Sequence, residues 1–191
     1  SSTDADAANT LTLDNDTLAN TGTVLVENAA RLQLTDATTI NNTGGGTVTN
    51  HGEIESVVGL NVISNSAAFT SDGLIEVVGS SGASSADADA ANTLKLDNDT
   101  LTSTGVILVE NAARLQLTNS TTVDGSSSGT FTVHGELESV LNGNTIKNFT
   151  AFTSDGMIEV VGSSGASSTD ADAANTLTLD NDTLANTGTV L

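Results

Sequence analysis

The chain has 191 residues and a formal net charge of −20, which arises from 24 acidic residues against four Lys and Arg. Such an acidic chain excludes nucleic acid and anionic lipid as partners, because phosphate binding needs Lys and Arg. The absence of Cys excludes disulfides and thiolate metal sites. No apolar run approaches the roughly 18 residues of a membrane-spanning helix, so we expect no membrane insertion.

A tandem repeat organises the chain, because the segment that begins at Ser1 returns at Ser84 and again at Ser167. Residues 1–83 align without a gap with residues 84–166 and are identical at 58 positions, and residues 167–191 match residues 1–25 without change. Such self-similarity is typical of repeat architectures, so we expect one continuous solenoid cut from a longer array. The predicted units are repeat 1 at 1–83, repeat 2 at 84–166 and the start of repeat 3 at 167–191.

Apolar spacing predicts three coils inside each repeat, at residues 11–26, 32–57 and 63–77 of repeat 1. Each coil has an alternating strand, a short strand with one large apolar residue, a turn that contains Gly, and another alternating strand. The period-2 alternation predicts strands with one buried face and one solvated face. A single coil of this kind cannot bury its apolar face alone, which favours a stacked array.

Turns and insertions complete the predicted repeat. The glycines at the turns are expected to take the left-handed backbone conformation, which Gly enters without steric cost. Asn20 and Asn50 at the corners are interpreted as ordinary turn residues, and the alternative is that stacked Asn side chains form amide ladders there. Two stretches exceed the coil template, and they predict an excursion or extended corner at Gly44–His51 and a projecting loop at Val78–Asn92.

The predicted fold class is all-β, a right-handed parallel β-helix or β-solenoid with three coils per 83-residue repeat. The right-handed sense follows from the usual handedness of crossovers between parallel strands. Stacking at about 4.8 Å gives an axial rise of about 14 Å per repeat. The alternative is a string of tandem immunoglobulin-like β-sandwiches, in which each bead advances roughly 30 Å.

Aspartate pairs are the candidate metal ligands, because hard carboxylate oxygens suit Ca²⁺ and a D-x-D spacing places both side chains on one side of an extended segment. The alternative is that they are solvated turn residues, since neither the glycine-rich β-roll nonapeptide nor an EF-hand loop is present. Ca²⁺ is the one cofactor that the sequence suggests. The candidates are Asp4, Asp6, Asp14, Asp16, Asp87, Asp89, Asp97, Asp99, Asp170, Asp172, Asp180 and Asp182.

No catalytic site is predicted, and we expect that the chain is not an enzyme. Glu53 and Glu55 flank Ile54 on the outward face, as Glu136 and Glu138 flank their own apolar residue. Stacked carboxylates can act on polysaccharides, but they recur in both repeats, whereas an enzyme site is a single event. The two His residues, one in each repeat, are expected to be ordinary turn residues.

The stretch GTVLVENAARLQLTDATTINNTGGGTVTNHGEIESV, residues 22–57, resembles repeats of giant bacterial adhesins of the filamentous-haemagglutinin or autotransporter kind. Those repeats carry A-x-L-x-L, T-x-I-x-N-x-G and N-x-G-x-I-x-V in succession. The resemblance implies export, a β-helical shaft at the cell surface, and a structural role in adhesion, biofilm matrix or surface filaments. The implied partners are further copies of the chain and a glycan or surface receptor. The alternative function is a calcium-stiffened adhesin stalk of β-sandwich repeats.

Overall fold

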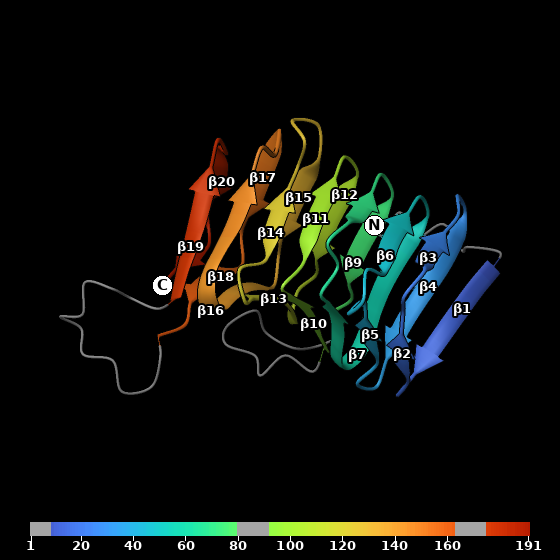
Figure 1. Ribbon diagram of the computed structural model, residues 1–191. Helices are drawn as coiled ribbons and strands as arrows, with labels where there is room; N and C mark the ends of the chain where they lie inside the picture. Colours follow the sequence, from blue (N-terminus) through green and yellow to red (C-terminus); the bar gives the residue numbers. More distant parts are fainter. Residues whose placement is uncertain (1–8, 80–91, 163–174) are drawn as a thin grey trace.

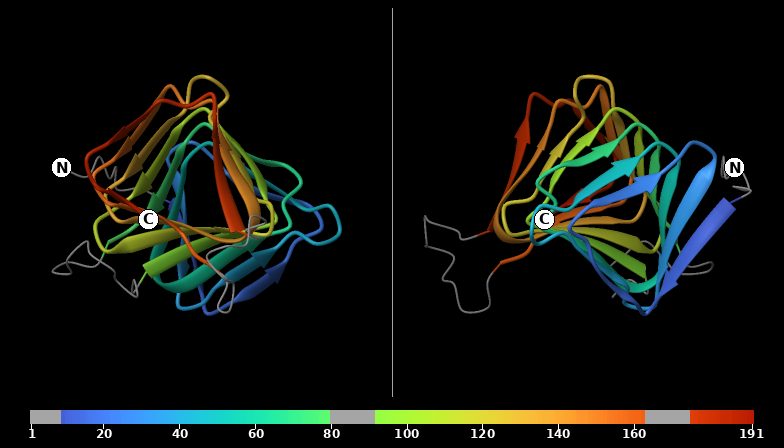
Figure 2. Two further views of the ribbon diagram at one scale, coloured as in Figure 1. Left: turned by 90° about the vertical axis from the view of Figure 1, so that its left-hand side faces the viewer. Right: turned by 45° about the vertical axis from the view of Figure 1, so that its right-hand side comes forward.

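The computed structural model describes residues 9–79, 92–162 and 175–191, and all regular structure in these ranges is β-strand. Successive strands wind into a coil, and the turns of the coil stack along one axis (Figure 1). All described pairings between strands are parallel. The coil has a triangular outline in the turned view (Figure 2). The predicted parallel β-solenoid is therefore confirmed, and the β-sandwich alternative is wrong.

Each side of the triangle is one parallel sheet, and we call the three sheets faces A, B and C. Face A contains β1 (Asn9–Asp14), β4 (Ala30–Thr35), the first part of β7 (Glu53–Ser64), β9 (Leu74–Val77), β12 (Val106–Val109), β15 (Thr130–Val133), β17 (Ala151–Ser154) and β20 (Leu184–Asn186). Face B contains β2 (Thr17–Ala19), β5 (Thr39–Asn41), the second part of β7, β10 (Asn92–Asp97), β13 (Ala113–Thr118), the first part of β16 (Glu136–Lys147), β18 (Met157–Val160) and β21 (Thr189–Val190). Face C contains β3 (Thr23–Val26), β6 (Thr47–Asn50), β8 (Phe69–Ser71), β11 (Thr100–Ser103), β14 (Thr122–Asp124), the second part of β16 and β19 (Asn175–Asp180).

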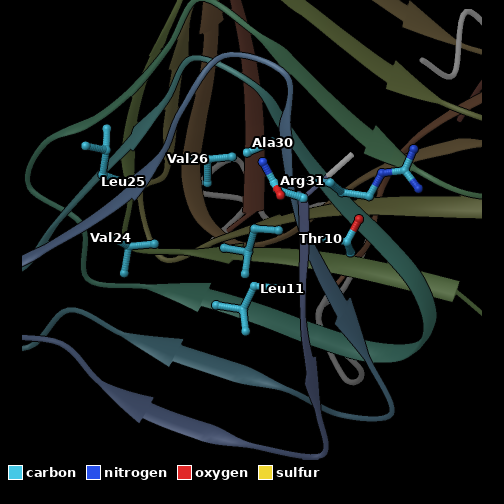
Figure 3. A pocket seen from close by; sticks show the side chains of 9 residues that line it. Thr10, Leu11, Val24, Leu25, Val26, Ala30 and Arg31 are labelled. Carbon is cyan, nitrogen blue, oxygen red and sulfur yellow. The ribbon is translucent and has the colours of Figure 1, made fainter. Parts of the chain in front are cut away.

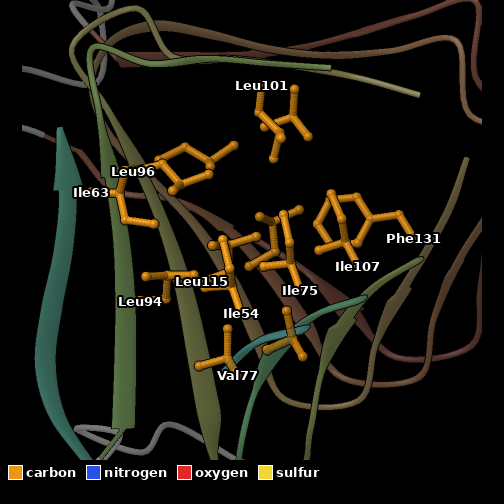
Figure 4. Close-up of a cluster of buried hydrophobic side chains, with 14 of the residues drawn as sticks. Ile54, Ile63, Ile75, Val77, Leu94, Leu96, Leu101, Ile107, Leu115 and Phe131 are labelled. Carbon is orange, nitrogen blue, oxygen red and sulfur yellow. The ribbon is translucent and has the colours of Figure 1, made fainter. Parts of the chain in front are cut away.

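The core is a stack of inward-facing apolar side chains that runs through both repeats. On face A, strand register places in one row Leu32, Ile54, Ile75, Ile107, Phe131 and Phe152. All six are at least 96% buried and belong to one core cluster, part of which is drawn in Figure 4. Burial of such a row stabilises the fold by roughly 2 kcal/mol per side chain.

The repeat length does not match a whole number of coils. Repeat 1 supplies ten sides of the triangle, namely β1 to β6, the two parts of β7, β8 and β9, so one repeat makes three coils and one further side. Equivalent strands of successive repeats therefore lie on different faces: β1 on face A, β10 on face B and β19 on face C. Each repeat is rotated by one side relative to the one before it. Ten sides also raise the expected axial advance to about 16 Å per repeat.

The extra side of the triangle is β6, which lies in the stretch Gly44–His51 that was predicted to be an excursion or an extended corner. Within Gly44–His51 the chain forms β6, which pairs in register with β3 and buries Val48 completely. The prediction of an excursion there is wrong, because Val48 is a core residue of face C and the strand around Ile54 already begins the next coil. The other predicted insertion falls largely on residues 80–91, which lie outside the described residues.

The turn glycines have a different role from the predicted one. Among the described glycines only Gly44, Gly45 and Gly59 have positive φ. Gly52 and Gly73 instead stack at one corner, where a Cβ atom on Gly73 would overlap the carbonyl oxygen of Gly52. These glycines are needed because successive backbones approach closely, and Asn residues take left-handed positions elsewhere.

Candidate functional site: a carboxylate cluster in each repeat

Half of the aspartates predicted to bind Ca²⁺ can be placed in the structure. The first aspartate of each pair ends one of the equivalent strands β1, β10 and β19, and the second lies two residues further on; the six are Asp14, Asp16, Asp97, Asp99, Asp180 and Asp182. The other six lie outside the described residues, and they are Asp4, Asp6, Asp87, Asp89, Asp170 and Asp172.

Asp99 shows what the second aspartate of a pair does when a coil lies on either side. Its Oδ1 accepts a hydrogen bond from the backbone N–H of Ser66 at 2.7 Å, and its Oδ2 accepts one from Asp97 N at 3.0 Å. Its own N–H donates to Thr121 Oγ1 at 3.2 Å, so the residue ties three coils together. Burial raises the pKa of Asp99 to about 7, against the opposing effect of the hydrogen bonds from Ser66.

The first aspartate of that pair also has protein partners. Asp97 accepts a hydrogen bond from Asn119 Nδ2 at 2.6 Å and lies 3.0 Å from Lys95 Nζ. No pair of these aspartates belongs to a group of three potential metal ligands within the part of the chain that the structure describes. The placed pairs thus connect coils, and their calcium binding stays a prediction.

A different set of acids comes together on face A. Strand register places Glu53 beside Arg31, and it aligns Gln33, Glu55 and Glu76 in one row across β4, β7 and β9. One carboxylate oxygen from each of the three glutamates lies within 4.8 Å of the others. Although these glutamates alternate with inward-facing Ile54 and Ile75, all three are at least 93% buried. We call Glu53, Glu55 and Glu76 the first carboxylate cluster.

Side-chain partners hold two members of this cluster through one oxygen each. Arg31 Nε donates to Glu53 Oε2 at 2.9 Å, and Gln33 Nε2 donates to Glu55 Oε2 at 2.8 Å. Glu53 Oε1 is buried and accepts no hydrogen bond. Within the described residues, Glu76 has no hydrogen-bonding neighbour except the carboxyl group of Glu53. The first carboxylate cluster therefore holds one buried oxygen, Glu53 Oε1, that no protein group satisfies.

The excess of negative charge is reflected in the protonation of Glu76. Burial raises its pKa to about 7, and the charges of Glu110, Glu53 and Glu55 raise it further in the same direction. Glu110 lies in repeat 2, and its Oε2 accepts a hydrogen bond from Gly79 N at 2.9 Å. The environment of the cluster in repeat 1 is therefore completed by a residue of the following repeat.

The same arrangement recurs in repeat 2, where it lies on face B. Arg114 Nε donates to Glu136 Oε2 at 2.8 Å, and Gln116 Nε2 donates to Glu138 Oε2 at 2.6 Å. Oxygens of Glu136, Glu138 and Glu159 again lie within 4.8 Å of one another, and we call these three residues the second carboxylate cluster. Burial raises the pKa of Glu136 in spite of its ion pair with Arg114.

Sequence reasoning identified four of the six glutamates and missed Glu76 and Glu159. The sequence did contain a feature that could have identified Glu76, namely its distance from the turn glycine. Glu55 follows Gly52 by three positions, and Glu76 follows Gly73 by three. Because these glycines stack at the same corner, equal offsets place the two glutamates side by side.

An apolar hollow near the start of the coil has a simpler origin. A space of about 440 Å³ is lined by residues of β1, β3 and β4, among them Leu11, Val24 and Leu32 (Figure 3). Leu11 is 61% exposed, whereas its equivalent Leu94 is completely buried where β10 pairs with β7. The hollow is therefore the end of the apolar core where the first described coil is not covered.

The two histidines occupy equivalent turns and pair with aspartates. His51 Nδ1 lies 2.8 Å from Asp72 Oδ1, and His134 Nδ1 lies 2.7 Å from Asp155 Oδ1. Both pairs are well exposed to solvent. As expected from the sequence, they are turn residues, and neither belongs to a group of three potential metal ligands in the described ranges.

Comparisons with known proteins do not assign this chain to a family. No protein-family model, no characterised protein and no solved structure matches the chain. Within the described residues, no helix is long and apolar enough to cross a membrane.

Proposed function

We propose that this chain is a segment of a structural shaft, and that the shaft belongs to an exported bacterial repeat protein that acts in adhesion, in surface filaments or in a biofilm matrix. The observation that carries the proposal is the continuity of the fold across the boundary between repeats. β10 of repeat 2 stacks directly on β7 of repeat 1, in register over six residue pairs. Further copies would extend the same rod without a hinge.

Three further features favour a scaffold. The carboxylate clusters recur in both repeats, as expected for a feature of the shaft and not for a single catalytic centre. The net charge of −20 disfavours nonspecific lateral aggregation of neighbouring shafts. The adhesin-like motifs of residues 22–57 form β3 to β6 and the first part of β7, which are strands that build the coil. Export and a glycan or surface receptor as partner belong to this proposal through the resemblance of those motifs.

Rod length provides the test of the shaft. Chains with two, four and six exact copies of the repeat would be compared by small-angle X-ray scattering, and the maximum dimension should grow by about 16 Å per added copy. Growth of roughly 30 Å per copy, or a compact particle whose length does not follow copy number, would contradict the proposal.

The proposed export of the protein to the cell surface is tested by a separate experiment. Antibodies raised against the 191-residue chain should label intact, unpermeabilised producing cells, and brief protease treatment of those cells should remove the signal. Labelling that requires permeabilised cells would contradict export and would leave the rod itself unaffected.

A further inference from the structure

We propose that each repeat binds one Ca²⁺ ion in its carboxylate cluster, at Glu53, Glu55 and Glu76 in repeat 1 and at Glu136, Glu138 and Glu159 in repeat 2. This inference goes beyond the proposed structural role, because the cluster could bind an ion whatever the shaft is used for. It also concerns residues other than the aspartate pairs that the sequence suggested.

The geometry of the oxygens fits the ion. Ca²⁺ takes carboxylate oxygens at about 2.4 Å, so two ligands on opposite sides of the ion are about 4.8 Å apart and adjacent ligands are closer. The three oxygens of each cluster lie within 4.8 Å of one another. They come from two neighbouring strands, β7 and β9 in repeat 1, whose parallel register fixes their spacing.

The hydrogen bonds leave one oxygen available where an ion needs it. Arg31 and Gln33 each bind the Oε2 atom of their glutamate, as Arg114 and Gln116 do in repeat 2. Glu53 Oε1 is left buried without a hydrogen bond. A buried carboxylate oxygen without a partner costs free energy, and coordination of a cation would remove that cost.

Glu76 supplies the second and independent indication. It is 95% buried, and within the described residues it has no Arg, Lys or N–H partner. It nevertheless places an oxygen beside those of Glu53 and Glu55. Three neighbouring carboxylates repel one another when all are ionised, and either protonation of Glu76 or a cation between the carboxylates relieves this repulsion.

The charges also match a divalent cation. When a bound cation keeps all three carboxylates ionised, they carry three negative charges, and Arg31 contributes one positive charge through its contacts with Glu53 at 2.9 Å and Glu55 at 3.7 Å. Two negative charges remain, and Glu110 of the following repeat adds a further negative charge nearby. A hard divalent ion with flexible coordination is the best fit to an all-oxygen site of this kind.

The test is a count of bound Ca²⁺ by equilibrium dialysis of the chelator-treated 191-residue chain, with Ca²⁺ alone as the probe. Glu76→Gln and Glu159→Gln should each remove one bound ion, and the double variant should remove two. Asp36→Asn is the matched control, because Asp36 is exposed, has positive φ that Asn tolerates, and loses the same charge. The control should bind as many ions as the wild type.

The difference in bound Ca²⁺ between wild type and each variant reports on the carboxylate clusters alone, because any Ca²⁺ bound by the aspartate pairs would be the same in all of these proteins. Wild type that binds no Ca²⁺ at millimolar concentration, or a double variant that binds as many ions as wild type, would overturn the proposal. Thermal unfolding provides a second readout: Ca²⁺ should raise the melting temperature of wild type and Asp36→Asn by several degrees more than that of the double variant. An equal rise in all three proteins would also overturn it. Neither result affects the rod-length test.

Discussion

Two corners of the coil carry equivalent sequence positions and are packed in different ways. At the corner between faces B and C, a column of polar side chains runs from repeat 1 into repeat 2. At the corner between faces C and A, the equivalent positions of repeat 2 contain glycine and phenylalanine. The members of the polar column are Asn20, Asn42, Ser66, Asp99, Thr121 and Asn144, and those of the aromatic corner are Ser103, Gly125, Phe149 and Asp182.

The polar column is hydrogen-bonded at every step. Asn20 Nδ2 donates to Asn42 Oδ1 at 2.7 Å, and Asn42 Nδ2 donates to Ser66 Oγ at the same distance. Ser66 N then donates to Asp99 Oδ1 of repeat 2. An amide-to-amide hydrogen bond therefore joins Asn20 to Asn42, whereas Asn50 at the other corner donates to Ser71 Oγ at 3.0 Å. The column continues across the boundary between repeats because each repeat is rotated by one side.

The aromatic corner replaces hydrogen bonds by ring packing. The Phe131 ring stacks on Phe152 with centroids 4.9 Å apart and lies 5.5 Å from Phe149. Gly125, at the position of Asn42, is required because a Cβ atom there would come within 2.7 Å of the Phe149 ring. Ser103 Oγ, at the position of Asn20, is left buried without a partner. A corner of the coil can therefore be filled either by hydrogen-bonded polar side chains or by packed aromatic rings, provided that the residues of neighbouring coils change together.

The largest effect is expected from removing the Phe131 ring, which lies on face A and packs against Phe149 of the aromatic corner. Phe131→Ala should destabilise the chain by about 4 kcal/mol, because it removes a completely buried ring and leaves a cavity. The equivalent change in repeat 1, Val48→Ala, should cost roughly 2 kcal/mol, since it removes less apolar volume. Chemical denaturation of both variants checks the difference. Equal losses would contradict the expectation that Phe131 fills more of the core than Val48 does.

An intermediate effect is expected from pH through Asp99. Its pKa is raised from 3.8 to about 7 by burial, so the folded state favours the protonated form. The contribution of this group to stability should be greatest below pH 4, should decrease by on the order of a few kcal/mol between about pH 4 and pH 7, and should then level off. Denaturant titrations at pH 4, 6 and 8 would measure the slope.

The variant Asp99→Asn separates this group from the other acids. It cannot ionise, so the decrease in stability between pH 4 and pH 8 should become smaller by the amount that Asp99 contributes. The exposed Asp36→Asn should leave the slope close to that of wild type. If both variants lose the same part of the slope, the dependence reflects the overall negative charge and not the buried corner.

The smallest effects are expected from single polar side chains. Asn42→Ala should cost about 2 kcal/mol, because Asn20 and Ser66 would each lose a buried partner. Ser103→Ala should be neutral or stabilising by less than about 1 kcal/mol, because its hydroxyl is already without a partner. A comparison of the two melting curves gives the result, and a larger loss for Ser103→Ala than for Asn42→Ala would refute this account of the corners.

The 83-residue period, the absence of helix and the parallel coil could be read from the sequence, because the alternation of residues such as Leu32, Gln33 and Leu34 depends on strand geometry alone. The same alternation placed Glu53 and Glu55 on the outward face. The alternation is a local property that a few neighbouring residues fix, and the period is a match of the sequence with itself that needs no knowledge of the fold.

The number of sides and the composition of the cluster depended on which strand stacks on which. Val48 belongs to the core because β6 pairs with β3, and Glu76 joins Glu53 and Glu55 because β9 pairs with β7. Register between coils is set by corner length and by the packing of facing side chains, which come from positions far apart along the chain. The 83-residue period is therefore determined by the sequence alone, whereas the rotation of one side per repeat is a consequence of how the coils stack.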